Sequence, residues 1–392
     1  MEIDEIYKNY CENGDQDLIK YIENIVNEKS MNAQWDRGIE GQSENLTTIL
    51  LYEYATSIEK LTNGIITSKQ VVDKLSNQMG KLRFGDYKDK NDDNVCYDKN
   101  SVTSDEYKKK CRIEKHFGAH APQYTDENGK TRCAIVLFDN KQEFNGMTLS
   151  GIDLSDLTDI RHTIFHEWTH VMEMQTVKAS ELSMDDILYR DGESVYINTT
   201  ASVDWSMEEF EDYISSVSGL VQGDKEISFS GISTIEINKK KNPNRRIMHN
   251  QIDEGATEFI ARKVMSIVDD TAKRPDRYKE QVKIIEKIFS SLGLDKSVAT
   301  YFSAPQKLLR ILERKRIGGV DFLHYISDVV NCSGKGVDLQ QFFRDIDIIC
   351  GELESDKPLE EVTTGDVVKN ALSHDIIERA RSSERLAEED YR

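Results

Sequence analysis

Apolar residues recur three or four positions apart through the first part of the chain. This spacing places them along one side of a helix. Two such series are Leu18, Ile19, Ile22, Ile25 and Val26, then Leu46, Ile49, Leu50 and Tyr54. The helical pattern runs from Asp4 to about Leu82 and predicts a helical N-terminal module over residues 1–84.

The pattern changes in the next part of the chain. Residues 85–131 are polar and rich in turn-forming types, which indicates long loops, an insertion or a hinge. Residues 132–138, RCAIVLF, form a short apolar run with β-branched members after a polar start. Such a run predicts a strand.

Two further helices are predicted where the helical spacing returns. The first spans Ser155–Gln175, with Ser155 or Asp156 as its N-cap, and the second spans Gln251–Val268. Each has apolar residues along one side: Leu157, Ile160, Ile164, Trp168, Val171 and Met172 in the first, and Ile252, Ala256, Phe259, Ile260, Val264 and Ile267 in the second.

The remaining segments complete a helix-rich α+β pattern. Residues 227–237, ISFSGISTIEI, indicate strands, and residues 239–246, KKKNPNRR, indicate a basic turn. After Pro275 the spacing is again helical to Cys350, and a charged helical tail closes the chain.

Composition narrows the classes of partner. The chain has 392 residues, of which 38% are apolar and 31% charged, as in a folded globular protein. Its net charge of -20 argues against nucleic acid or an anionic membrane as a partner, because phosphates would be repelled. No stretch has the form of a signal peptide or a membrane span. We therefore expect a cytoplasmic protein or one delivered by a leaderless route.

The first candidate chemistry lies in the motif HEWTH, at residues 166–170. On a helix, His166 and His170 are one turn apart, so both imidazoles can face one ion, and they are expected opposite the apolar series. Glu167 is placed to hold a water molecule as a general base without binding the ion itself. A structural histidine pair, capping a helix or bonded within a core, would have the same spacing.

A catalytic zinc ion needs a third protein ligand from another segment. The motif DEGATEF, at residues 253–259, places Glu254 and Glu258 one turn apart on the next predicted helix, again opposite its apolar series. We expect Glu254 to bind the ion. Glu258 is then placed to accept a hydrogen bond from a ligand histidine and fix its tautomer.

H-E-x-x-H followed by E-G-x-x-E resembles the gluzincin metallopeptidases, the group that includes thermolysin. The resemblance covers residues 156–175 and 250–265 and the order of the two motifs. It implies one Zn²⁺ per chain, held by His166, His170 and Glu254, with Glu167 as general base and acid. It also implies a zincin-like, two-lobed domain with a small mixed sheet, an active-site helix and a helical C-terminal lobe.

Applied to the whole chain, the resemblance gives four parts. A helical N-terminal module spans residues 1–84, and an N-terminal lobe with loops, edge strand, active-site helix and an insertion spans residues 85–250. A helical C-terminal lobe with the third-ligand helix spans residues 251–352, and a charged helical tail spans residues 353–392. The stretch between the motifs is much longer than in thermolysin, and we expect the inserted residues to line the substrate cleft.

Family members also use a tyrosine or histidine to stabilise the oxyanion. No motif fixes this residue here. His249, just before the second ligand helix, is the first candidate, with Tyr278 and Tyr301 as alternatives. A histidine in an ordinary turn, with no role in the site, would have the same position in the sequence.

The resulting hypothesis is a zinc-dependent peptidase that acts on peptide or protein substrates, with Glu167 activating the hydrolytic water. An endopeptidase is favoured because no segment marks an anchor for a substrate amino terminus. One alternative is a non-catalytic binding or regulatory protein on the same scaffold. Another is a peptidase that acts as a toxin or effector on a specific protein. The oligomeric state is left open.

Overall fold

The computed structural model describes most of the helices and the strands between them. The described residues are 3–36, 43–85, 119–120, 123–125, 131–138, 143–144, 147–148, 156–173, 175–178, 188–191, 194–197, 226–229, 231–232, 234–238, 242–248, 250–272, 278–318, 320–331 and 338–359. Helices dominate this part of the chain, with several small sheets, so the expected helix-rich α+β class is confirmed.

The chain divides into two compact units. Unit 1 comprises residues 1–59, 67–171 and 261–273, and unit 2 comprises residues 60–66, 172–260 and 274–392. Helices α3, α6 and α9 each contribute residues to both units.

Unit 1 begins with the predicted helical segment. Its helices are α1 (Ile3–Asn13), α2 (Gln16–Glu28), α3 (Leu46–Leu61) and α4 (Ser68–Gln78). The apolar series predicted on α2, Leu18, Ile19, Ile22, Ile25 and Val26, is buried throughout. Asp15 caps α2 by accepting the backbone N–H groups of Asp17 and Leu18. Helix formation here follows from local sequence, namely a good cap and a continuous apolar side.

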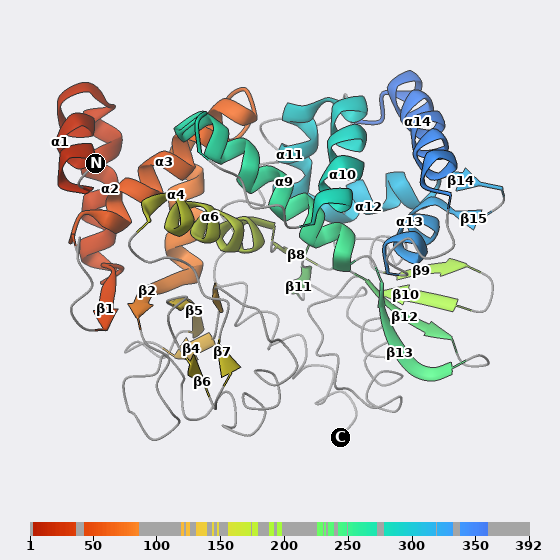
Figure 1. The fold of residues 1–392 in the computed structure, drawn as a ribbon, viewed down its shortest axis with the longest axis horizontal. Coiled ribbons are helices and arrows are strands. Elements are labelled where there is room, and N and C mark those ends of the chain that lie inside the picture. The colour runs from red at the N-terminus through yellow and green to blue at the C-terminus, as the bar shows by residue number, and fades with distance from the viewer. Residues whose placement is uncertain are drawn as a thin grey trace. The chain divides into compact units, whose positions relative to one another are not determined.

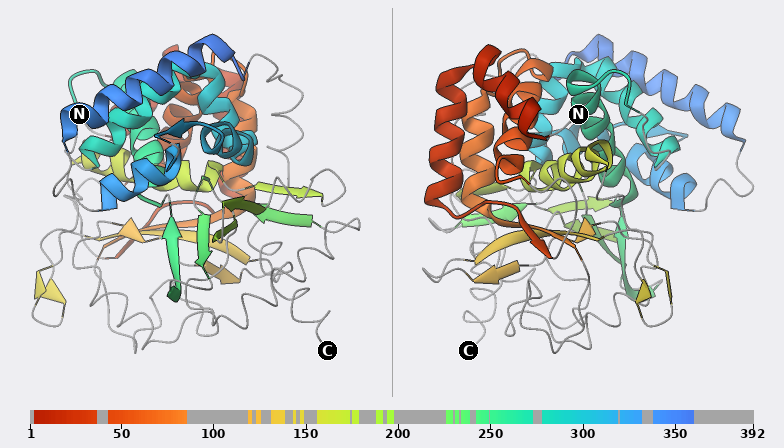
Figure 2. Two further views of the ribbon diagram at one scale, coloured as in Figure 1. Left: turned by 90° about the vertical axis from the view of Figure 1, so that its right-hand side faces the viewer. Right: turned by 60° about the vertical axis from the view of Figure 1, so that its left-hand side comes forward.

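The sheet of unit 1 is small and mixed. Its strands are β1 (Gln34–Asp36), β2 (Met79–Gly85), β3 (Ala119–His120), β4 (Gln123–Thr125) and β5 (Thr131–Phe138). The strand order is β1-β2-β5-β3, and β4 also pairs with β5. Strands β1, β2 and β5 are parallel to one another, whereas β3 and β4 are antiparallel to β5. Helix α4 packs against β2 and β5, on the face of the sheet where α1–α3 also lie (Figure 2). A short hairpin, β6 (Glu143–Phe144) and β7 (Met147–Thr148), precedes α6 (Leu157–Glu173).

Unit 2 contains a second, antiparallel sheet. Its order is β13 (Asn242–Met248), β12 (Thr234–Asn238), β10 (Ser194–Ile197) and β9 (Leu188–Asp191). A separate antiparallel pair joins β8 (Gln175–Lys178) to β11 (Glu226–Phe229).

Helices make up the rest of unit 2 (Figure 1). Most of α9 (Asn250–Val268) belongs here, followed by α10 (Lys279–Leu292), α11 (Leu294–Ser303), α12 (Pro305–Glu313), α13 (Phe322–Asn331) and α14 (Leu339–Asp356). The short strands β14 (Arg316–Ile317) and β15 (Val320–Asp321) pair between α12 and α13. Helix α10 packs against α11 and α14.

The secondary structure confirms several predictions and corrects two. The strand predicted at residues 132–138, the helices predicted around HEWTH and DEGATEF, and strands within residues 227–237 are all present. The helical pattern does not continue to Leu82, because residues 79–85 form β2, parallel to both of its neighbours. Residues 242–246 belong to strand β13 instead of a basic turn. Residues 79–85 pair with two strands distant in sequence, whereas residues 242–246 pair with the preceding strand, β12, in a hairpin. In both places strand pairing overrides the local pattern.

Two other expectations concern the chain as a whole. Within the described residues, no helix combines the length and apolar character needed to cross a membrane. The four-part division by residue number stays a prediction, and the tail beyond residue 359 lies outside the described residues.

Candidate metal centre

Helix α6 carries HEWTH and is buried on more than one side. It starts after Asp156, whose carboxylate accepts the backbone N–H of Thr158 at 2.8 Å, as predicted for the cap. Ile160, Ile164 and Trp168 of the predicted apolar series are buried, but so are Phe165 and Thr169. More of the helix circumference is therefore buried than the spacing of apolar residues predicted.

Aromatic contacts with α3 explain the extra burial. The ring of Tyr54 lies 5.4 Å from that of Phe165 and 5.5 Å from that of Trp168, measured between centroids. The Tyr54 hydroxyl lies 3.0 Å from the Thr169 hydroxyl, which donates to the Phe165 carbonyl at 2.7 Å. Tyr54 is therefore the donor in the first contact. This packing holds α6 on α3.

A buried ion pair adds a second attachment of α6 to α3. The Arg161 guanidinium donates to Glu53 through Nε, at 2.8 Å to Oε2, and through Nη2 to Oε1. The Tyr10 hydroxyl donates to the same carboxylate at 2.8 Å. The side chains of Arg161 and Glu53 are only 10% and 2% exposed. Helix α6 is thus fixed to the N-terminal helices by charge as well as by packing.

The histidines of HEWTH occupy the less buried side of α6. His166 and His170 are half-buried, with imidazole centroids 5.0 Å apart and ring planes at 80°. Glu167 is also half-buried, whereas His162 is almost fully buried. The spacing of the histidines is that expected for one turn of helix.

Helix α9 carries the second motif. Glu254 is half-buried, as expected for a side chain opposite the apolar series, but Glu258 is as buried as the apolar residues themselves. Gly255 allows close contact with α10, since a Cβ there would lie 2.5 Å from Cβ of Gln281. The hydrogen bond from a ligand histidine to Glu258 stays a prediction.

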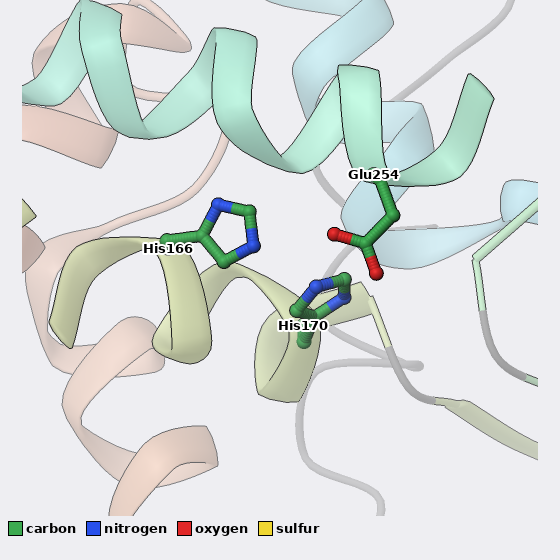
Figure 3. Close-up of side chains that lie close together, drawn as sticks. All are labelled: His166, His170 and Glu254. Atoms are coloured by element: carbon green, nitrogen blue, oxygen red, sulfur yellow. The ribbon is translucent and has the colours of Figure 1, made fainter. Parts of the chain in front are cut away.

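Among the described residues, the predicted ligands of the two motifs form one group. Ligand atoms of His166, His170 and Glu254 all lie within 4.8 Å of one another. Figure 3 shows both imidazoles directed from α6 toward the Glu254 carboxylate. Atoms about 2.0–2.1 Å from a tetrahedral zinc ion are roughly 3.3 Å apart, so small side-chain rotations would suffice to close this group around an ion. Two nitrogen donors and one carboxylate also match the donor set of catalytic zinc sites.

A second group lies next to the first. His170, Glu173 and Asp253 also have ligand atoms within 4.8 Å of one another, and Glu173 and Asp253 are buried. Neither carboxylate was predicted to belong to the site. Their positions in the sequence could have indicated it, because Glu173 is three residues after His170 and Asp253 directly precedes Glu254.

The three candidates for oxyanion stabilisation are placed differently. His249 lies outside the described residues. Tyr278 is half-buried at the start of α10, with a left-handed φ of 50°. Tyr301 is fully buried, and burial together with the charges of Asp253 and Glu173 raises its pKa well above the ordinary tyrosine value. Its hydroxyl is turned to these carboxylates and not to a surface that substrate could reach.

Comparison with known proteins adds no family to this picture. No family model matches the chain, and no curated protein or solved structure matches it.

Proposed function

We propose that this protein is a zinc-dependent peptidase, and specifically an endopeptidase. The observation that carries the proposal is the group formed by His166, His170 and Glu254, whose ligand atoms lie within 4.8 Å of one another although they come from two motifs 84 residues apart. A chance H-E-x-x-H would have no reason to meet a carboxylate from E-G-x-x-E. The zincin-like, two-lobed arrangement belongs to the same proposal.

The residues of the two motifs have different roles in the proposed reaction. Zinc, when bound, supplies a Lewis acid that polarises a carbonyl and lowers the pKa of water. His166, His170 and Glu254 hold the ion, and two neutral ligands with one anionic ligand leave it a net positive charge. Glu167, one position after the first ligand, accepts the proton of the attacking water and delivers it to the leaving amine. Glu167 is half-buried and so keeps contact with solvent.

The proposed substrates, peptides or proteins, rest on the resemblance of the two motifs to those of the gluzincin metallopeptidases, since the motifs themselves would serve any metal-assisted hydrolysis. In the hydrolysis of a peptide bond, Glu167 would supply the proton that the leaving amine requires. The endopeptidase assignment is supported by the sequence, in which no segment marks an anchor for a free amino terminus.

The first test of the proposal is zinc content. The parent protein and Glu254→Ala are reconstituted with zinc, dialysed together and measured by elemental analysis. We expect about one zinc per parent chain and little in the variant, because two histidines alone hold zinc weakly. Glu280→Ala is the matched control, since Glu280 is a half-exposed glutamate paired with Lys283 on α10. No zinc in the parent, or equal zinc in Glu254→Ala, would refute the site.

The second test separates catalysis from binding. A peptide library is digested by the parent and by Glu167→Gln, and cleavage is followed by mass spectrometry. The variant is expected to keep its zinc and to lose activity by about a hundredfold or more, the range for removal of a general base. Zinc without any Glu167-dependent cleavage would instead support the non-catalytic binding protein.

A further inference from the structure

We propose that Tyr301 is a positioning residue of the metal centre, whose hydroxyl ties Glu173, one turn after His170, to Asp253, immediately before Glu254. The inference rests on the proposed function, because it concerns the same metal ligands. It assigns a role to a residue on a third helix, α11, that no motif includes.

The Tyr301 hydroxyl makes several polar contacts. It donates to Glu173 Oε2 and lies 2.9 Å from Asp253 Oδ1. The Thr257 hydroxyl lies 3.2 Å from the same phenol oxygen and 3.4 Å from Glu173 Oε2. One phenol oxygen thus links the last turn of α6 to the first two turns of α9.

Asp253 is fixed independently from the other side. Its Oδ1 accepts the backbone N–H of Ile232 at 2.9 Å. The preceding residue, Gly231, has φ of 49°, and a Cβ there would lie 2.2 Å from Asp253 Oδ1. The backbone therefore approaches Asp253 at a position where only glycine fits.

Burial makes these contacts strong. Tyr301 is 0% exposed, and Glu173 and Asp253 are 1% and 4% exposed. Buried carboxylates need hydrogen-bond donors, and loss of a donor leaves the full cost of desolvation. Burial and the neighbouring carboxylates raise the pKa of the phenol well above the ordinary tyrosine value, so the hydroxyl keeps its proton at neutral pH. The Tyr301 hydroxyl has one proton and donates to one carboxylate at a time, and the Thr257 hydroxyl is a further donor beside it.

The link acts on the metal ligands through short, stiff lengths of helix. Glu173 and His170 are three residues apart on α6, and Asp253 and Glu254 are neighbours on α9. A shift of either carboxylate is therefore transmitted to a ligand within one helical turn. Because a metal site tolerates displacements of only about 0.5 Å, loss of the link should weaken zinc binding.

The first experiment compares two tyrosines. Tyr301→Phe and Tyr325→Phe each remove one hydroxyl that donates to a carboxylate and keep the ring. Tyr325 is the matched control because its hydroxyl donates to Asp345, which lies outside the two ligand-bearing helices. The zinc dissociation constant is measured by competition with a chromogenic chelator, and circular dichroism of the metal-free proteins verifies the fold. We expect Tyr301→Phe to weaken zinc binding about 10- to 100-fold, as for other partners of metal-binding groups, and Tyr325→Phe to leave it unchanged. Equal affinities in Tyr301→Phe and the parent would overturn the inference.

A second pair of variants tests whether Glu173 holds Tyr301 or binds the ion itself. Glu173→Gln retains a polar group that can donate to the phenol oxygen, whereas Glu173→Ala removes the contact. We expect Gln to keep the zinc affinity of the parent and Ala to lose it to the same extent as Tyr301→Phe. Loss in both variants would identify Glu173 as a ligand and reject the positioning role. Absence of zinc from the parent would reject the proposed function as well, so the two failures are distinguishable.

Discussion

Replacing Arg161 by methionine should destabilise the protein in a way that depends strongly on pH. Arg161→Met keeps most of the side-chain volume but removes both hydrogen bonds to Glu53. The Glu53 carboxylate would remain 2% exposed, with Tyr10 as its remaining donor among the contacts described above. Removing one partner of a buried pair costs about 3–5 kcal/mol, which agrees with two charge-assisted hydrogen bonds of about 1.5–3 kcal/mol each.

The pH dependence follows from the protonation of Glu53. Burial raises the pKa of this carboxyl group, and the Arg161 guanidinium opposes the rise. An acid with a raised pKa in the folded state contributes stability below its unfolded value of 4.5, and this contribution is lost as the pH rises through the folded pKa. Without Arg161 the folded pKa is higher still. The deficit of Arg161→Met should therefore grow as the pH rises above 4.5 and be smaller at about pH 5 than at about pH 8.

Urea unfolding of the metal-free proteins, followed by circular dichroism at both pH values, measures this difference. Arg161→Met with Glu53→Gln should recover much of the stability at the higher pH, because the charge left in the core is removed. Lys283→Met is the matched control, since its pair with Glu280 is half-exposed and contributes at most about 1 kcal/mol. A deficit of Arg161→Met that does not change with pH would refute the buried ion pair as the attachment of α6.

Two glycine substitutions give further predictions. Gly255→Ala should lower the free energy of unfolding by about 1–3 kcal/mol, because its Cβ would lie 2.5 Å from Cβ of Gln281. Gly351→Ala is the control, since in the described part of the chain nothing beyond the adjacent backbone of its own helix lies within 4 Å of the added Cβ, and helix propensity should make urea unfolding slightly harder. Gly231→Ala should reduce both stability and zinc affinity, because its Cβ would displace the Asp253 carboxylate; chelator competition that showed an unchanged zinc affinity would contradict the role given to Asp253.

The sequence was sufficient for features that depend on neighbouring residues. The i, i+4 spacing of His166 and His170 and the cap at Asp156 are local, so the helix around HEWTH could be predicted with nearly correct limits. The residues of DEGATEF predicted α9 in the same way. The meeting of His166, His170 and Glu254 could be anticipated only because H-E-x-x-H leaves one ligand missing.

Features that depend on distant residues could not be predicted. Strand β2 follows α4 without a break in the apolar pattern and is defined by its pairing with β5, about fifty residues later. Glu258 was expected to face outward, yet it is 1% exposed, because the burial of α9 is set by the elements that pack around it. The periodicity of apolar residues predicts which face of a helix is buried, but not how many further faces are buried by other elements.

The proposed metal ligands and the residues that support them differ in how the sequence encodes them. The proposed ligands lie in two short motifs, whereas Tyr301 is 128 residues from Glu173 and 48 from Asp253, and Arg161 is 108 residues from Glu53. A second chain could possess both motifs and lack these supports, and it would then have the correct ligands without the spacing that zinc requires. The presence of the motifs identifies a candidate site, and the buried contacts of Tyr301 and Arg161 explain how this chain could keep that site in a fixed geometry.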